Sequence, residues 1–272
     1  MVSMDLEKIP IERLPGIKQI QNLASKYYER KLLAEVMSSG NTPQHVAIIL
    51  DGNRRFADDV GIDRLEGHKL GAKKLENVVG WCQELGIKHI TVYAFSTENF
   101  NRSGEEVKSL MELFAKKFRE VAEDQRIHKY KIRVKAIGDL GVLPKEVQRA
   151  IDEAQKLTQA YDGYTLNIAV SYGGRSELAH AVKKICEKIE KGEVKPKDIS
   201  EDLISQHLYT AGLPDPDLII RTSGEERLSG FLLWQSAYSE LYFCEANWPA
   251  FSKVDFLRAI RTYQGRMRKF GR

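Results

Sequence analysis

Six short apolar runs alternate along the chain with longer segments in which apolar residues recur at helical spacing. The runs lie at residues 46–50, 89–95, 132–137, 164–171, 218–220 and 241–243. Helical i, i+3, i+4 spacing occurs between most of them, at 75–85, 107–121, 147–157 and 178–189. Strands that are apolar throughout, separated by amphipathic helices, are typical of a mainly parallel sheet covered on both faces. We therefore predict an α/β fold with a six-stranded sheet flanked by helices.

Residues 1–42 differ from the rest of the chain. They contain a polar start, a helical pattern over 17–37 and a stop signal at 38–43, which reads SSGNTP. We predict an N-terminal helical extension at 1–42 and a single catalytic domain at 43–272. We interpret the helix as packing on the domain; a membrane-surface helix or a partner-binding helix are the alternatives.

The charge balance and the cysteine content narrow the functional class. Lys and Arg number 42 against 38 Asp and Glu, a net charge of +4, which does not favour a nucleic-acid binder. Cys82, Cys186 and Cys244 are far apart, which favours free thiols in a reducing compartment. The first ten residues do not resemble a signal peptide, and no apolar stretch reaches the ~20 residues of a membrane span. We expect a cytoplasmic protein.

Polar and glycine-rich segments follow the predicted strands. In a parallel sheet such segments gather at the carboxyl edge, where ligands bind. They include DGNRR at 51–55, STENFNR at 96–102, YGGRS at 172–176 and RTSGEER at 221–227. Each alone has an ordinary explanation as a turn, a helix cap or a solvated ion pair. Together they predict one charged site at this edge.

The residue types of this edge favour phosphate groups as the ligand. Six arginines are expected to converge there, beside glycines that let backbone N–H groups approach an anion: Arg55, Arg64, Arg102, Arg175, Arg221 and Arg227. Two separate clusters, one after the first strand and one after the fifth, suggest more than one phosphate group. Asp51 and Glu240 are candidate oxygen ligands for Mg²⁺, which binds one or two carboxylates together with phosphate oxygens.

The common nucleotide and hydrolase motifs are missing from the sequence. It contains no GxxxxGK[ST], no GxGxxG after the first strand, no HExxH and no GxSxG. His68 is the histidine best placed for chemistry, and a structural hydrogen bond is an equal explanation for it. The residues therefore favour a diphosphate site without a nucleotide.

The segment HVAIILDGNRRFA at 45–57 resembles the first signature motif of the cis-prenyltransferases, the undecaprenyl and dehydrodolichyl diphosphate synthases. Further blocks of resemblance follow in the family's order, at 67–69, 93–102, 167–175, 218–225, 231–235 and 238–243. The resemblance covers residues 43–272. It implies a Rossmann-like homodimer with an apolar substrate tunnel and Mg²⁺ as cofactor.

The resemblance also implies roles for individual residues. Asp51 and Asn99 are expected to be catalytic, and Asp51 and Glu240 to bind the metal. The allylic substrate is expected to contact Gly52, Asn53, Arg54, Arg55, Phe56, Arg64, His68, Ser96, Thr97, Glu98, Phe100 and Arg102. The isopentenyl diphosphate is expected to contact Arg221, Arg227 and Ser229. The chain departs from the usual family residues at Phe56, Phe100, Ser223, Gly230 and Lys269-Phe270-Gly271.

The implied reaction condenses isopentenyl diphosphate with farnesyl or geranylgeranyl diphosphate, giving a cis-polyprenyl diphosphate for a lipid glycosyl carrier. A short-chain or irregular coupling of two prenyl diphosphates is one alternative. A non-catalytic subunit of a hetero-oligomeric transferase is another, although such subunits usually lack equivalents of Asp51 and Arg55. We expect the two diphosphates and a second copy of the chain as partners, and peripheral membrane contact is compatible with long products.

Overall fold

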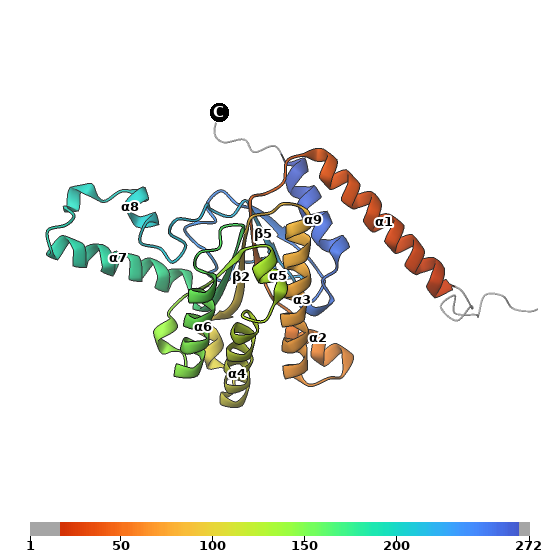
Figure 1. Ribbon diagram of the computed structural model, residues 1–272, viewed down its shortest axis with the longest axis horizontal. Coiled ribbons are helices and arrows are strands. Elements are labelled where there is room, and N and C mark those ends of the chain that lie inside the picture. Colours follow the sequence, from red (N-terminus) through yellow and green to blue (C-terminus); the bar gives the residue numbers. More distant parts are fainter. Residues whose placement is uncertain (1–16, 267–272) are drawn as a thin grey trace, which may run out of the picture. The chain divides into compact units, whose positions relative to one another are not determined.

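The structure is a computed structural model that describes residues 17–266 (Figure 1). Its strands are β1 (His45–Ile49), β2 (His89–Ser96), β3 (Ile132–Ile137), β4 (Tyr164–Tyr172), β5 (Leu218–Arg221) and β6 (Glu240–Phe243). Its α-helices are α1 (Ile17–Ser39), α2 (Asn53–Val60), α3 (Arg64–Glu84), α4 (Gly104–Glu120), α5 (Gln125–Lys129), α6 (Lys145–Thr158), α7 (Gly174–Glu190), α8 (Glu201–Ser205) and α9 (Lys253–Gly265). Short 3₁₀ helices lie at η3 (Thr97–Asn101), η4 (Leu140–Val142), η5 (Pro196–Asp198) and η6 (Trp248–Ala250).

The six strands form one sheet in the order β3-β4-β2-β1-β5-β6, and every pair in it is parallel. The predicted α/β fold is confirmed, and each predicted strand agrees with the observed one within two residues. β1 lies between β2 and β5, so the chain leaves β1 in opposite directions on its two sides. Ligands of open α/β sheets bind at such a reversal of strand order.

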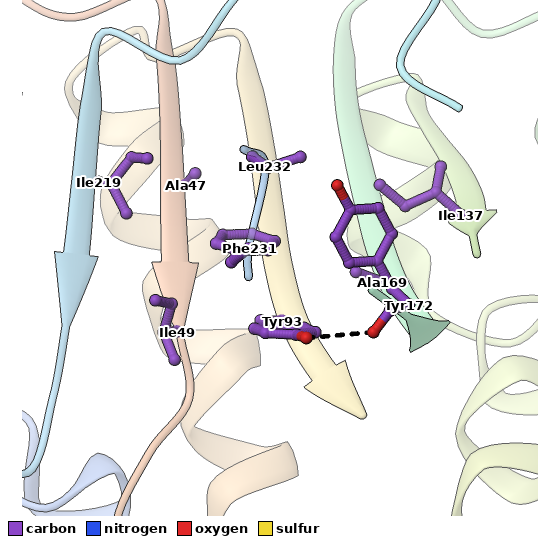
Figure 2. Close-up of a cluster of buried hydrophobic side chains, with 9 residues drawn as sticks. All are labelled: Ala47, Ile49, Tyr93, Ile137, Ala169, Tyr172, Ile219, Phe231 and Leu232. Carbon is purple, nitrogen blue, oxygen red and sulfur yellow. Dashed lines mark hydrogen bonds between the residues drawn. The ribbon is translucent and has the colours of Figure 1, made fainter. Parts of the chain in front are cut away.

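The two faces of the sheet carry different structures because neighbouring side chains point to opposite faces. Leu50, Ala94 and Ile168 face α3 and α4, with which they line an apolar cavity. The residues that precede or follow them belong to a separate buried cluster, which Figure 2 shows: Ala47, Ile49, Tyr93, Ile137, Ala169, Tyr172, Ile219, Phe231 and Leu232. Phe231 and Leu232 of this cluster belong to the loop after β5, so the sheet separates that loop from the cavity.

Helix α3 begins well before the apolar stripe that predicts it. Asp63 caps its first turn by accepting a hydrogen bond from the N–H of Leu65 at 2.8 Å. The first turns bury Gly67 and Gly71 instead of large apolar residues. Hydrophobic spacing therefore detects only the second half of the helix.

Helices α1 and α9 form a second compact unit, apart from residues 42–251. The predicted helix at 17–37 is confirmed, and it packs against α9 through ion pairs from Arg261 to Glu35 and from Lys253 to Glu29, both at 3.6 Å. The Gln264 amide also donates to the carbonyl of Val36 at 2.9 Å. The domain limits at 42 and 43 stay a prediction, and Lys269-Phe270-Gly271 lies outside the described residues.

Two further findings concern the thiols and the membrane. Cys82, Cys186 and Cys244 form no disulfide with one another, and burial raises the pKa of the Cys82 thiol. Among residues 17–266, no helix is both long and apolar enough to cross a membrane.

A buried chain of hydrogen bonds crosses the amino-terminal part of the sheet. The Asn167 amide donates to the Thr91 hydroxyl at 3.1 Å, and this hydroxyl contacts His45 Nε2 at 2.7 Å. His45 Nδ1 lies 2.7 Å from the carbonyl oxygen of Pro214, which can only accept. Nδ1 therefore carries the proton, and Nε2 accepts from Thr91. Burial lowers the pKa of His45 to about 4, so the ring is neutral at pH 7.

We expect the neutral His45 to make the free energy of unfolding decrease as the pH decreases. Its folded pKa lies below the ordinary value, so the unfolded chain binds the proton more readily. This contribution is complete above pH ~6.5 and is lost as the pH falls toward 4, on the order of 3 kcal/mol in all. Urea unfolding at several pH values should show the gap between wild type and His45→Gln shrinking over this range. A constant gap would contradict the assignment.

Candidate active site

The site lies at the carboxyl edge of the sheet, where β1, β2 and β5 end side by side. Residue pairing places Ile49 beside both Tyr93 and Arg221. Asp51 therefore follows the central strand, with η3 on one side and the segment after β5 on the other. The predicted convergence of the DGNRR, STENFNR and RTSGEER segments agrees with this register.

Asp51 is held by its backbone and by one buried arginine. Its N–H donates to the Thr222 hydroxyl at 3.0 Å, which in turn donates to the Asp51 carbonyl at 2.7 Å. Its carbonyl also accepts from the N–H of Trp248 at 2.9 Å. The carboxylate accepts from the Gly52 N–H at 2.8 Å and from Arg221 at 2.7 Å. These backbone contacts fix the position of the carboxylate independently of what it binds.

Gly52 needs to be glycine for two reasons. Its φ of 97° lies in the left-handed region that favours glycine. A Cβ atom at this position would also lie 2.4 Å from Asn247 Oδ1. The turn directs Asn53, Arg54 and Arg55 into the first turn of α2, beside Asp51.

The first arginine cluster consists of Arg54, Arg64 and Arg102, which line a hollow on the surface together with Glu106. Arg102 donates to Glu106 at 3.0 Å, and Arg54 lies 3.9 Å from the same carboxylate. Arg64 pairs instead with Asp58 at 3.0 Å, and this hydrogen bond raises the pKa of Arg64. The three cations border one hollow, and carboxylates are their present partners.

Glu106 is a site residue that the sequence did not single out. The SGEE segment at 103–106 suggests only a capping box, and Ser103 does cap α4 by accepting from the Glu106 N–H at 3.3 Å. The Glu106 carboxylate, however, is occupied by Arg102. Arg102 is a local partner four residues before it, whereas the approach of Arg54 from α2 and of His68 from α3 depends on packing that local spacing does not report.

His68 lies beside this cluster and is neutral at pH 7. Burial, and then the nearby Arg102 guanidinium, lower the pKa of His68 to about 4. Its Nε2 atom is buried, lies 3.6 Å from Glu106 and makes no hydrogen bond. Burial also lowers the pKa of Arg102. His68 is therefore a neutral group next to the hollow, with an unused ring nitrogen.

The second arginine cluster consists of Arg55, Arg221 and Arg227. Arg55 donates to the Ser223 carbonyl at 2.7 Å and to its hydroxyl at 2.5 Å. Glu225 pairs with Arg55 at 3.0 Å and with Arg227. The hydrogen bond from Arg55 is the largest cause that lowers the pKa of Glu225. These contacts join the start of α2 to the segment after β5.

Arg221 connects the two sides of the site. Its side chain is only 5% exposed, and it donates to Asp51 and, at 2.8 Å, to the hydroxyl of Ser229. It also donates to the carbonyl of Arg227. One planar guanidinium thus holds the carboxylate after β1 and the loop after β5 in a fixed relation.

The departures at 223 and 230 involve unusual backbone angles. Ser223 has a φ of 77° and Ser229 a φ of 49°, both left-handed. A non-glycine residue in this region costs about 1 kcal/mol or more. The hydrogen bond from Arg55 to Ser223 offsets this cost. Gly230 has a φ of 78°, which suits glycine, and its carbonyl accepts from the N–H of Gly174 at 2.9 Å.

Asn99 and its neighbours form the border of the site after β2. Asn99 accepts from the Ser96 N–H at 3.1 Å, which completes a capping box for η3. Glu98 lines the hollow of the first cluster, and a Cβ atom on Gly173 would lie 2.8 Å from the Thr97 hydroxyl. Phe100 is 38% exposed and packs edge-on against Phe95. The expected contacts of this segment, and of half-buried Phe56, with a substrate stay predictions.

Two predicted site residues are not brought to these clusters. Arg175 is exposed in the first turn of α7, and no contact within the described residues joins it to either cluster. Glu240 begins β6 and pairs with Leu218, at the amino end of β5. Asp51 lies at the opposite edge of the sheet, so one chain does not place the two carboxylates together. A metal role for Glu240 stays a prediction.

The apolar cavity opens beside the first cluster. Asn53 and His68 lie at this end, and α3, α4 and the sheet form the walls, with Leu75, Leu110, Phe114 and Leu166 among the lining side chains. A ligand with a long apolar group and a phosphate could place the apolar group in the cavity and the phosphate beside the arginines. The family resemblance predicts an apolar substrate tunnel; the structure contains an apolar cavity, and its role as a substrate tunnel stays a prediction.

Gly67 and Gly71 allow α3 to approach the start of α2. A Cβ atom on Gly67 would lie 2.5 Å from the carbonyl oxygen of Asn53 and 2.9 Å from Ala57 Cβ. A Cβ atom on Gly71 would lie 2.0 Å from Asn53 Oδ1. The carbonyl of Gly71 accepts from the Trp248 indole at 2.8 Å. These glycines thus position the residues that follow Asp51.

We expect Gly67→Ala to displace the start of α2 and to lower both stability and activity. Both neighbours of the added methyl are rigid, so overpacking should cost about 1–3 kcal/mol of unfolding free energy. Gly80→Ala is the matched control, because it lies on the same helix with nothing within 4 Å of its Cβ. That change should stabilise by about 0.5–1 kcal/mol. Urea unfolding measures both, and equal effects would refute the positioning role of Gly67.

Comparison with known proteins gives a consistent result. A sequence model of the family described as putative undecaprenyl diphosphate synthase matches residues 49–271. A tritrans,polycis-undecaprenyl-diphosphate synthase (geranylgeranyl-diphosphate specific) from Methanocaldococcus jannaschii is 58% identical over 249 residues, covering 91% of this chain and 89% of the relative. The matched regions include both arginine clusters and the cavity.

Two solved structures are similar as well. Lavandulyl diphosphate synthase from Lavandula x intermedia, in complex with dimethylallyl diphosphate, has a TM-score of 0.80 and 41% identity, covering 85% of this chain and 99% of that one. A probable undecaprenyl diphosphate synthase from Campylobacter jejuni has a TM-score of 0.70 and 33% identity, covering 85% and 100%. The fold therefore has solved counterparts.

Proposed function

Because this chain belongs to the undecaprenyl diphosphate synthase family of cis-prenyltransferases, we propose that it extends geranylgeranyl diphosphate with isopentenyl diphosphate. The product is a cis-polyprenyl diphosphate, which suits a lipid glycosyl carrier. The primer is taken from the relative in Methanocaldococcus jannaschii, which is named as specific for geranylgeranyl diphosphate. Farnesyl diphosphate, the other primer expected from the sequence, is the comparison substrate.

The observation that carries the proposal is the bridge from Arg221 to Asp51 and Ser229 at the carboxyl edge of the sheet. In the sequence, Asp51 lies between Leu50 and Asn53, which both line the apolar cavity. The first arginine cluster lies on the cavity side of this bridge, and the second lies on the loop side. A primer with its diphosphate in the first cluster has its chain in the cavity. Isopentenyl diphosphate held by Arg221, Arg227 and Ser229 would then lie next to the reacting carbon. Arg55 is expected to contact the allylic diphosphate, although its present partners are Ser223 and Glu225.

The residues of the site fit Mg²⁺ if substrate phosphates and water supply the remaining ligands. No group of three or more His, Cys, Asp or Glu that could hold a metal occurs among residues 17–266. Mg²⁺ commonly binds one carboxylate together with substrate phosphates and water, and Asp51 offers that carboxylate beside the arginines. Asp51 would hold the ion. When bound, Mg²⁺ would neutralise charge on the diphosphate.

The arginines stabilise the charge that develops during the reaction. The allylic C–O bond breaks and diphosphate leaves, while the isopentenyl double bond forms the new carbon–carbon bond and a proton is lost. Arg54, Arg64 and Arg102 would donate hydrogen bonds to the departing oxygens in place of their present carboxylate partners. Neutral His68 adds a ring nitrogen next to that group without adding charge.

The apolar cavity protects the cationic carbon. Its walls are mainly aliphatic and aromatic side chains, so water is kept from the carbon until the new bond forms. Asn99 is fixed by Ser96 at the border of the site, and we propose that it orients the reacting groups. Its amide is a poor base, so we assign it no proton transfer.

The state of assembly and the location belong to the proposal as well. We propose a homodimer in the cytoplasm, with peripheral contact to the membrane when long products are made. Light scattering coupled to size exclusion tests the dimer. Co-sedimentation with phospholipid vesicles, with and without product, tests the membrane contact.

The alternatives are separated by one set of assays. The protein with Mg²⁺, labelled isopentenyl diphosphate and one primer at a time should yield longer prenyl diphosphates, most with geranylgeranyl diphosphate. No incorporation with any primer would overturn the proposal and favour a non-catalytic subunit. Product formed from allylic diphosphates alone, without isopentenyl diphosphate, would instead favour irregular coupling.

A further inference from the structure

The end of the apolar cavity away from the arginine clusters is lined by charged residues. We call Glu76, Lys117, Glu120, Asp124 and Arg126 the ionic cluster; all five line the cavity. Glu76 on α3 is its centre, because one oxygen pairs with Lys117 at 3.2 Å and the other with Arg126 at 3.0 Å. Lys117 also pairs with Glu120 at 2.7 Å, and Arg126 with Asp124 at 2.6 Å.

The strand directions place this cluster opposite the diphosphate end. Leu50 follows the carboxyl end of β1, whereas Ile132 begins β3, and both line the cavity. The cavity therefore runs along the sheet from the carboxyl edge toward the amino edge. Helix α4 runs in the same direction, from Glu106 in the first arginine cluster to Lys117 in the ionic cluster.

The distance between the two ends matches the length of a short primer. Eleven residues separate Glu106 from Lys117, which is about 16 Å of helix. An extended isoprene repeat spans about 5 Å, given carbon–carbon bonds of about 1.5 Å. Three to four repeats thus reach the ionic cluster. A chain of undecaprenyl length would have to pass it.

The ionic cluster joins separate elements and is partly exposed to solvent. Glu76 comes from α3, Lys117 from α4, and Arg126 from α5. Their side chains are 37%, 33% and 47% exposed. Exposed ion pairs of this kind are individually weak. The cluster can therefore close the cavity in the free enzyme and still be opened by an apolar chain pushed against it.

We propose that the ionic cluster is a gate that sets product length, and that the growing chain leaves the cavity by separating Glu76 from Lys117 and Arg126. This inference rests on the proposed elongation of a prenyl primer. Each added unit moves the apolar end outward, so chains longer than the primer must open the gate. The strength of the cluster then decides how far elongation proceeds.

Glu76→Gln tests the gate because it removes the charge that both cations share and keeps the shape of the side chain. Glu146→Gln is the matched control. Glu146 pairs with Arg119 of α4 at 2.5 Å but does not line the cavity. For Glu76→Gln we expect the ratio of longer to shorter products to rise about fivefold, which corresponds to ~1 kcal/mol. The first condensation and the KM for the primer should stay within about twofold of wild type.

A reversible cross-link tests the opposite direction. Glu76→Cys with Lys117→Cys, in a Cys186→Ser background, can be joined by a reducible bismaleimide. The unlinked protein should make longer products, as Glu76→Gln does. The linked protein should stop within a few units of the primer, and reduction should restore elongation.

The outcomes separate the two hypotheses. If wild type adds no isopentenyl units, the proposed function fails. If wild type elongates but Glu76→Gln and Glu146→Gln give the same product lengths, the gate is refuted. A cross-linked enzyme that still makes full-length products refutes it as well.

Discussion

Asp51→Asn should lower turnover by roughly two to three orders of magnitude. The amide keeps the shape of the side chain but loses the negative charge that a divalent cation and the Arg221 guanidinium both need. The backbone of Asp51 stays fixed by Thr222 and Trp248, so the turn itself should persist. The loss should therefore appear in the rate of the chemical step and not in the fold.

The measurement is single-turnover incorporation of labelled isopentenyl diphosphate at saturating Mg²⁺ and primer. Asp152→Asn, an exposed change on α6, is the control for loss of one negative charge. Urea unfolding should show that Asp51→Asn lowers stability by no more than about 1–3 kcal/mol. Near-normal turnover of Asp51→Asn would refute the role of this carboxylate.

The sheet could be predicted from the sequence because its signal is local. The run 46–50 is apolar throughout and the run 164–171 is mainly apolar, and the helices between the runs repeat at 3.6 residues. The carboxyl-edge rule then brings Asp51, Arg102 and Arg221 to one side without knowledge of the strand order. The rule does not give the division into clusters, because Arg55 follows the first strand but pairs with Ser223 and Glu225 after the fifth.

The residues that the sequence did not reveal depend on contacts between distant segments. Glu106 lies in a possible capping box, yet its carboxylate also lies 3.9 Å from Arg54 of α2 and 3.6 Å from His68 of α3. In the sequence, Gly67 is only a weak helix former within a helix, whereas in the structure its missing side chain lets α2 approach α3. Asn247, more than 190 residues after Gly52, restricts that turn. No periodicity marks such positions, because periodicity reports which face of an element is buried and not which element covers it.

Glu240 and Arg175 show the limit of the carboxyl-edge rule. The rule applies to residues after a strand, and Glu240 is the first residue of one. Its register with Leu218 places it at the amino edge. Arg175 does follow a strand, but α7 begins at Gly174 and carries its side chain to the surface. Proximity in sequence to a strand end is thus not sufficient to bring a residue to the arginine clusters within one chain.

Arg221→Lys should raise the KM values of both substrates and lower kcat, because a single ammonium cannot reach Asp51 and Ser229 together. Arg221 is buried and donates to both, so losing one of these charged hydrogen bonds should cost about 2–5 kcal/mol of transition-state stabilisation. Arg227→Lys is the matched control. The Arg227 side chain is 62% exposed, so Arg227→Lys should lower the free energy of unfolding by less than about 1 kcal/mol.

The kinetic pattern separates a bridge from a simple binding residue. If Arg221 couples the two diphosphate sites, Arg221→Lys should affect both KM values, whereas Arg227→Lys should raise only that of isopentenyl diphosphate. Initial rates measured over a grid of both substrate concentrations decide between them. An effect of Arg221→Lys on one substrate alone would place Arg221 in a single site. The coupling through Asp51 would then have to come from the Thr222 hydroxyl, which hydrogen-bonds to the backbone N–H and carbonyl of Asp51.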